Sequence, residues 1–125
     1  PMSDSLVMLC NVLNSLPNSV IVIGKDGKVI DANQAPCLTH GVDSISELSV
    51  TDEVKEALTR ALTGEYCQTE YKIVNRKTGK ELWLKARCNP VYTNGETPAG
   101  VSLFEKDVTS QKQMINELKS IKLKG

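Results

Sequence analysis

Residues 20–32 read Val-Ile-Val-Ile-Gly-Lys-Asp-Gly-Lys-Val-Ile-Asp-Ala and predict a β-hairpin. The first four residues are all β-branched, which is typical of a strand that is buried on both faces. Asp26-Gly27 is a turn signal, since a tight hairpin turn needs residues that accept positive φ angles. Residues 29–32 then return as the second strand, so this segment predicts the start of an antiparallel sheet.

A mixed helical region follows the hairpin. We expect Asn33 to cap a short helix that runs through Cys37, whereas residues 39–50 carry little periodicity. Thr51 is a good helix start because two acidic residues follow it, near the positive end of the helix dipole. Gly64 is the expected C-terminal stop. The apolar face of this second helix consists of Val54, Ala57, Leu58, Ala61 and Leu62.

Three further strands are expected, at residues 66–74, 80–88 and 100–106. The middle strand alternates cleanly between apolar and polar residues, which indicates one buried and one exposed face. Its two faces carry Leu82, Leu84, Ala86 and Cys88 on one side and Trp83, Lys85 and Arg87 on the other. Asn89-Pro90 is expected to end or bend this strand.

Both ends of the chain are predicted to be helical. In the N-terminal segment, which Pro17 ends, leucines recur with the spacing of an amphipathic helix at Leu6, Leu9, Leu13 and Leu16. The C-terminal segment carries a short coiled-coil seam at Met114, Leu118 and Ile121. We therefore divide the chain into a flanking helix (1–17), a central domain (18–108) and the start of an exit helix (109–125).

The composition describes one neutral globular domain. The chain has 125 residues, 40% of them hydrophobic, and its 15 basic residues balance 15 acidic ones. One sizeable core is possible at this length, and the lack of a basic field argues against nucleic-acid binding. No apolar run is long enough to span a membrane, and no signal peptide is present. We therefore expect a cytoplasmic protein without direct membrane contact, whose four cysteines are reduced and mostly buried.

The order of these segments and their residues resembles a PAS domain. The family's opening is similar to residues 16–23 (Leu-Pro-Asn-Ser-Val-Ile-Val-Ile), 26–30 (Asp-Gly-Lys-Val-Ile) and 33–35 (Asn-Gln-Ala). Residues 61–65 resemble the end of its long helix, and Trp83 with Asn89-Pro90 resembles its fourth strand. Residues 100–109 resemble its last strand, which closes with an Asp-x-Thr signature at Asp107 and Thr109. The resemblance runs from about residue 15 to residue 119.

The resemblance implies an α+β fold with a five-stranded antiparallel sheet, in the spatial order 2-1-5-4-3, and short helices over one face. It also implies a sensory or dimerisation domain that relays ligand or redox state to a C-terminal output module. The parent would be a signal transduction protein such as a two-component histidine kinase, a chemoreceptor, a cyclic-dinucleotide enzyme or a transcription regulator. The domain itself would be regulatory and not an enzyme. A stand-alone small-molecule-binding or enzymatic α+β domain is the alternative.

By the same resemblance, a ligand would lie between the helices and the sheet. The expected pocket residues are Leu84, Ala86, Cys88 and Leu103 from the sheet and Leu38, Val54, Leu58 and Leu62 from the helices. This lining is apolar, so it favours a small organic or fatty ligand, or a collapsed core with no ligand. Asp107 and Thr109 stand where the sheet passes into the exit helix. They are expected to cap that helix and to relay the signal.

No catalytic residue, metal site or cofactor is expected. His40 is the only histidine, and haem-binding relatives carry their ligand on the long helix, which here has none. We therefore expect His40 to be a surface or loop histidine. Flavin-binding relatives use a reactive cysteine motif that this chain lacks, and they have amides where Leu84 and Ala86 stand. Neither a nucleophile elbow nor a Gly-rich phosphate loop is present in the sequence.

A homodimer is expected through the N-terminal helix and the outer face of the sheet. Leu6, Leu9, Leu13 and Leu16 share one side of that helix, yet its other sides are apolar too, so one sheet cannot easily cover it. Trp83 should lie on the outer face of the sheet and needs a cover. The seam of the exit helix is too short to hold a dimer alone. A monomer whose own N-terminal helix packs over Trp83 is the alternative.

Overall fold

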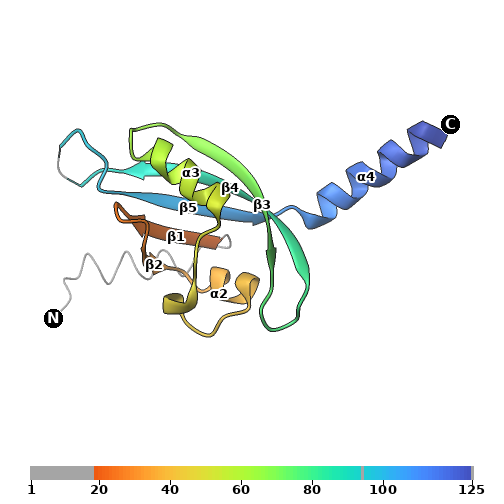
Figure 1. Cartoon of the computed structure of the whole chain (residues 1–125), viewed down its shortest axis with the longest axis horizontal. Helices are drawn as coiled ribbons and strands as arrows, with labels where there is room; N and C mark the ends of the chain where they lie inside the picture. Colours follow the sequence, from red (N-terminus) through yellow and green to blue (C-terminus); the bar gives the residue numbers. More distant parts are fainter. Residues whose placement is uncertain (1–18, 94, 125) are drawn as a thin grey trace.

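The computed structural model describes residues 19–93 and 95–124, and it contains a five-stranded antiparallel sheet. The strands are β1 (Ser19–Gly24), β2 (Val29–Ala32), β3 (Cys67–Val74), β4 (Glu81–Val91) and β5 (Gly100–Asp107). They lie in the order β2-β1-β5-β4-β3, as Figure 1 shows. The predicted α+β fold and the predicted strand order are therefore confirmed. The four leucines of the expected N-terminal helix lie outside the described residues.

The first hairpin forms as its sequence predicts. β1 lies between β2 and β5 and is buried along almost all of its length, which explains its unbroken run of β-branched residues. The turn closes with a hydrogen bond from the Gly24 N–H to the Lys28 carbonyl at 2.9 Å. Gly27 has a φ of 81°, which a residue with a side chain rarely adopts.

Helices occupy the segment between β2 and β3 and the end of the chain. They are α2 (Ala35–His40), the 3₁₀ turn η1 (Ile45–Glu47), α3 (Asp52–Ala61) and α4 (Thr109–Lys124). α3 starts as predicted, because the Thr51 hydroxyl accepts the Val54 N–H at 3.3 Å. In Figure 1, α3 lies across the sheet while α4 projects away from its end. No helix in the described part of the chain is long and apolar enough to cross a membrane.

The prediction that Asn33 caps α2 is wrong. Gln34 is the N-cap residue, and it makes no side-chain cap bond. Pro36 lies in the first turn, where a proline is favoured because its missing N–H has no helical partner to lose. Asn33 is instead 1% exposed, and its Oδ1 accepts the Val20 N–H at 3.0 Å. Its own N–H donates to the Val20 carbonyl at 3.1 Å. Asn33 therefore ties the segment after β2 to the start of β1.

β4 runs through Asn89-Pro90 instead of ending there. The pairing of β3 with β4 stops at Cys67 opposite Cys88, so residues 89–91 pair with β5 alone. One side of the strand is open at this point, which is where a sheet tolerates a proline that lacks a backbone donor. Pro90 accordingly stays in register, opposite Val101.

The inner face of the sheet and the helices bury one apolar cluster. Each large aliphatic side chain buried in it contributes about 1.5–3 kcal/mol to stability. The most buried members are Ile23, Val54, Ala61, Leu84, Ala86, Cys88, Val101 and Leu103, each 1% exposed or less. The polar groups of the inner face lie beside this apolar cluster.

Candidate functional site

A carboxylate lies inside the molecule, on the inner face of β5. Glu105 has the same parity as Leu103 and Val101, so it points toward the core, and it is 5% exposed. Its Oε1 accepts the Ser19 hydroxyl at 3.1 Å, and its Oε2 accepts the Tyr71 hydroxyl at 2.5 Å. The carboxylate therefore joins β1, β5 and β3. Buried charge is tolerated only where such donors surround it.

Tyr71 is held in its neutral form by this arrangement. The ring is 2% exposed, and burial, followed by the charge of Glu105 and the hydrogen bond to it, raises the pKa of Tyr71 far above its ordinary range. The phenol therefore stays protonated and donates to the carboxylate across the physiological pH range.

His40 completes the cluster, and the expectation of a surface or loop histidine is wrong. It is the last residue of α2, its side chain is 13% exposed, and its Nε2 lies 3.0 Å and 3.1 Å from the two oxygens of Glu105. The sequence pattern predicted this short helix only as far as Cys37, because residues 39–50 carry little periodicity. We call His40, Tyr71, Ser19 and Glu105 the Glu105 cluster.

The end of α2 is fixed to the hairpin that joins β3 and β4. Asn75 donates from its Nδ2 to the carbonyls of Leu38 and Thr39 at 3.0 Å and 3.1 Å. The Arg76 N–H donates to the His40 carbonyl at 3.0 Å. Gly41 follows with a φ of 72°, and a Cβ there would collide with the Asn75 amide. His40 is thus held at both its backbone and its ring.

The expected pocket residues have two different outcomes. Leu38 is 80% exposed, so its placement in an inner pocket is wrong, because α2 turns that side of the helix to solvent. Leu62 is half-buried and packs against the core. The remaining residues are buried in the apolar cluster of the inner face: Val54, Leu58, Leu84, Ala86, Cys88 and Leu103. A ligand between sheet and helices would have to lie among these side chains.

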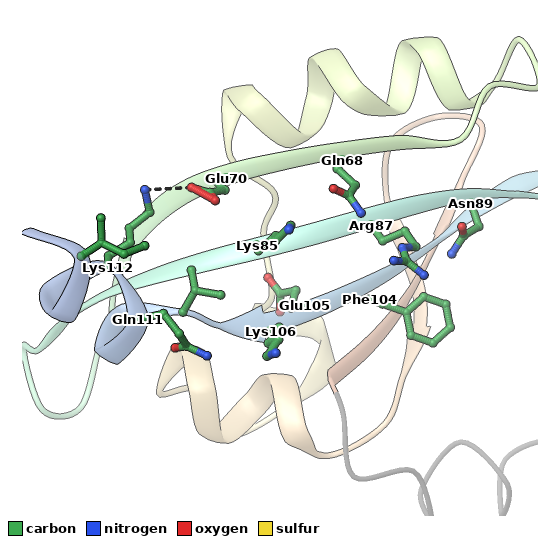
Figure 2. A pocket seen from close by; sticks show the side chains of 12 residues that line it. Gln68, Glu70, Lys85, Arg87, Asn89, Phe104, Glu105, Lys106, Gln111 and Lys112 are labelled. Carbon is green, nitrogen blue, oxygen red and sulfur yellow. Dashed lines mark ion pairs between the residues drawn. The ribbon is translucent and has the colours of Figure 1, made fainter.

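A hollow of about 720 Å³ lies on the opposite face of the sheet. Figure 2 shows it between the outer surfaces of β3, β4 and β5 and the first turns of α4. Its cations are Lys85, Arg87, Lys106 and Lys112, beside the half-exposed ring of Phe104. Lys85 stands opposite Lys106 in the register, a like-charge pair that destabilises a sheet. This face is therefore the more polar of the two.

Trp83 lies on the same outer face, as predicted, and is half-buried. The ammonium of Lys112 on α4 lies 4.4 Å from the ring centroid, and that of Lys72 on β3 lies 5.9 Å away. Lys112 also pairs with Glu70 at 2.8 Å. Within the described residues, the exit helix thus supplies a cation over the ring, an attraction worth about 0.5–2 kcal/mol.

Asp107 and Thr109 join β5 to α4, where the sequence placed them. Asp107 Oδ1 accepts the Thr109 N–H at 2.9 Å and the Thr109 hydroxyl at 2.6 Å. The Thr109 hydroxyl oxygen in turn accepts the Trp83 N–H at 2.9 Å, and the Val108 N–H donates to the Trp83 carbonyl at 2.8 Å. The start of α4 is therefore hydrogen-bonded to β4 as well as to β5.

The described residues contain no group of three or more metal-ligating side chains. Cys37, Cys67 and Cys88 are free thiols. The polar chemistry that the described residues place on the inner face is therefore concentrated in the hydrogen bonds of the Glu105 cluster.

A comparison with protein families finds that the model of the PAS fold matches residues 13–113. This chain belongs to the PAS family. PAS domains are regulatory sensory domains, and the matched segment contains the Glu105 cluster, the Asp107–Thr109 junction and the first turn of the exit helix. None of the curated proteins compared with the chain matches it.

Several solved PAS domains share the fold. One from Colwellia psychrerythraea superposes with a TM-score of 0.65 at 17% identity, covering 86% of this chain and 99% of that chain. The PAS domain of BvgS from Bordetella pertussis has a TM-score of 0.61 at 22% identity, covering 95% and 98%. A PAS domain from a two-component sensor histidine kinase has a TM-score of 0.64 at 11% identity, covering 82% and 96%.

Sequence reasoning missed the Glu105 cluster, although one signal for it was present. The period-two pattern of residues 100–106 places Glu105 on the same face as Leu103, and the pattern of residues 67–73 does the same for Tyr71. A charged residue at an inward position is the informative observation in such a pattern. Nothing in the sequence places His40 beside them.

Proposed function

We propose that this PAS domain is the sensory module of a cytoplasmic signal transduction protein, and that it relays the state of its inner face to an output module through α4. The observation that carries the proposal is the continuity of β5. Glu105 and Asp107 are two residues apart on one strand, the first in the buried cluster and the second at the cap of α4. A shift of β5 at Glu105 would reach the cap without passing through a flexible loop.

The Glu105 cluster connects three elements of the inner face to β5 through one shared acceptor. One carboxylate serves three donors that come from β1, β3 and α2. A ligand that takes one donor away, or that presses on α2, must change how the other two are shared. A buried network of this kind is cooperative, so a local change alters the position of the strand that carries the shared acceptor.

The proposed ligand is small and apolar, because six of the eight predicted pocket residues lie in the buried apolar cluster. No haem, flavin or metal is part of the proposal. Native mass spectrometry of the purified chain tests this point: an empty protein or a bound apolar molecule agrees with it. A stoichiometric polar or metal cofactor contradicts it.

The proposed partner is a second copy of the chain, which would cover the outer face around Trp83. The half-buried ring and the exposed apolar residues of α4 support this, since Met114, Leu118 and Ile121 are each more than half exposed. Light scattering should give a dimer for the intact chain and a monomer after deletion of residues 2–16. A monomer of the intact chain at high concentration contradicts this proposal.

Hydrogen exchange tests the relay. Glu105→Gln keeps the shape of the side chain and removes its charge, so we expect faster exchange of the amides of residues 108–112 at the start of α4. Glu81→Gln, at an exposed position in the same sheet, is the matched control and should leave those amides unchanged. If the change in exchange is confined to α2 and the residues around His40, the relay along β5 does not exist.

A further inference from the structure

Two of the three described cysteines face each other across two strands. Cys67 is the first residue of β3, and its Cα partner in the antiparallel register is Cys88 of β4. Both side chains point to the inner face, with 5% and 0% exposed. The sequence gives no sign of this pairing, since the two residues are 21 positions apart and only the register of the hairpin brings them together.

The spacing of such a pair suits a disulfide. Directly opposed residues of an antiparallel pair have Cα atoms about 4.5–5.5 Å apart, which lies within the range of about 4.4–6.8 Å found across disulfides. Their Cβ atoms need to approach by roughly 1 Å at most. Small neighbours permit that approach, because Ala86 is the next inward residue on β4.

The two thiols differ in how an oxidant can reach them. Cys88 is fully buried beside Leu103, and burial, followed by the charge of Cys67, raises the pKa of Cys88 to about 11. Cys67 lies at the end of an edge strand, next to Tyr66, which is 74% exposed. Its Sγ points to the Glu65 carbonyl at 3.8 Å. Opening of this strand end exposes Cys67 first.

We propose that Cys67 and Cys88 form an oxidative modification site, a cross-strand disulfide that a small hydroperoxide closes. The Cys67 thiolate attacks a peroxide oxygen, so that an S–O bond forms, the O–O bond breaks and hydroxide leaves. The Cys88 sulfur, losing its proton, then attacks the Cys67 sulfur: the S–S bond forms, the S–O bond breaks and water leaves. Two thiols and one hydrogen peroxide thus give one disulfide and two waters.

The disulfide would lock the first residue of the edge strand to β4. Cys88 of β4 also pairs with Leu103 of β5, which is two residues before Glu105, so the locked pair lies beside the relay strand. As an input signal, this site rests on the proposed sensory function. The disulfide itself does not, and the experiment reads the disulfide alone.

The experiment treats the folded 125-residue chain with hydrogen peroxide, then blocks free thiols and digests the protein with trypsin without reduction. We expect the peptides 61–72 and 88–106 to be joined, with the loss of two hydrogen atoms. The number of free thiols should fall from four to two. Dithiothreitol should restore all four. The wild-type digest needs no variant, so a variant that fails to fold does not remove the test.

Single cysteine-to-serine variants identify which two cysteines form the disulfide. Cys10→Ser and Cys37→Ser should keep the joined peptides, whereas Cys67→Ser and Cys88→Ser should abolish them while circular dichroism reports a folded chain. The proposal is overturned by the absence of a joined peptide, by a link to Cys10, Cys37 or another chain, or by oxidation that stops at a sulfinic acid on Cys67 with Cys88 still free. A link that appears only in urea overturns it as well, because it then belongs to the unfolded chain.

Discussion

The two faces of the sheet are made from alternate residues of the same strands, yet they treat charge in opposite ways. On the inner face of β5, Glu105 is buried and meets three donors. One residue later, Lys106 is exposed on the outer face and stands opposite Lys85, a residue of the same charge. The inner side of this strand is therefore specified by matched partners. The other is left with charge that only solvent or a further surface can match.

The largest expected effect follows from removing the inner carboxylate. Glu105→Ala leaves the hydroxyls of Tyr71 and Ser19 without an acceptor inside the core, so the free energy of unfolding should fall by about 3 kcal/mol. Lys106→Ala, the next residue on the same strand, should change it by less than about 0.5 kcal/mol. Urea unfolding measures both. Equal losses for the two variants would erase the difference between the faces.

A smaller loss is expected when only one donor is removed. Tyr71→Phe keeps the ring in the core and takes away the hydroxyl that donates to Glu105, so stability should fall by about 1–2 kcal/mol. Tyr66→Phe is the control, because Tyr66 is 74% exposed. If the two phenylalanine variants unfold at the same urea concentration, the hydrogen bond in the core adds nothing.

Tyr71 also predicts how stability changes at alkaline pH. Its folded pKa is raised far above the ordinary value of about 10, so above pH 10 the unfolded chain loses a proton that the folded chain keeps. The unfolded state then binds fewer protons, and the free energy of unfolding should fall by up to about 1.4 kcal/mol per pH unit. The contribution of Tyr71 to stability is fully present below pH 10. Tyr71→Phe should flatten this slope, and Tyr66→Phe should preserve it.

At the junction between β5 and α4, we expect the free energy of unfolding to change by about 1 kcal/mol. Asp107→Ala removes the acceptor for the Thr109 N–H and hydroxyl. Because this loss destabilises the folded state, the melting temperature should fall. Glu117→Ala, further along the exposed face of α4, is the control. An unchanged melting temperature for Asp107→Ala would remove this residue from the cap.

The smallest effect belongs to the outer face. Lys112→Ala takes the ammonium away from Trp83, a contact that contributes about 0.5–1 kcal/mol at an exposed site, and it also leaves Glu70 without this ion pair. Trp83 is the only tryptophan, so its fluorescence spectrum reports the change directly. Lys72→Ala, at 5.9 Å from the ring, should shift the spectrum less. The reverse order would mean that Lys112 is not the nearer cation to the Trp83 ring in solution.

The strands could be predicted from the sequence because their signals are local. The alternation of apolar and polar residues assigned Leu84 and Trp83 to opposite faces, and the cap residues Thr51 and Asp107 indicated where helices begin. The Glu105 cluster could not be predicted in full, because it joins residues 19, 40, 71 and 105 through the sheet order and the path of α2. The pairing of Cys67 with Cys88 likewise depends on the register of one hairpin, which the turn geometry sets.

The prediction of Leu38 as a pocket residue failed for a related reason. An apolar residue between the sheet and the long helix was expected to face inward, but α2 is short and its orientation is set by Pro36 and by the Asn75 contacts. Periodicity carries little information over so few residues. The orientation of α2 is set here by Asn75, which lies far along the chain from Leu38.

Asn75 also limits how the sequence can vary. Hairpin loops normally accept insertions because they face solvent. In the β3–β4 hairpin, Asn75 and Arg76 are bonded to the end of α2, and the close approach of Gly41 leaves no room for a side chain. A tag or an added residue before Lys77 would therefore act on the helix that carries His40. In this fold, the length of the β3–β4 turn therefore affects the position of His40 in the Glu105 cluster.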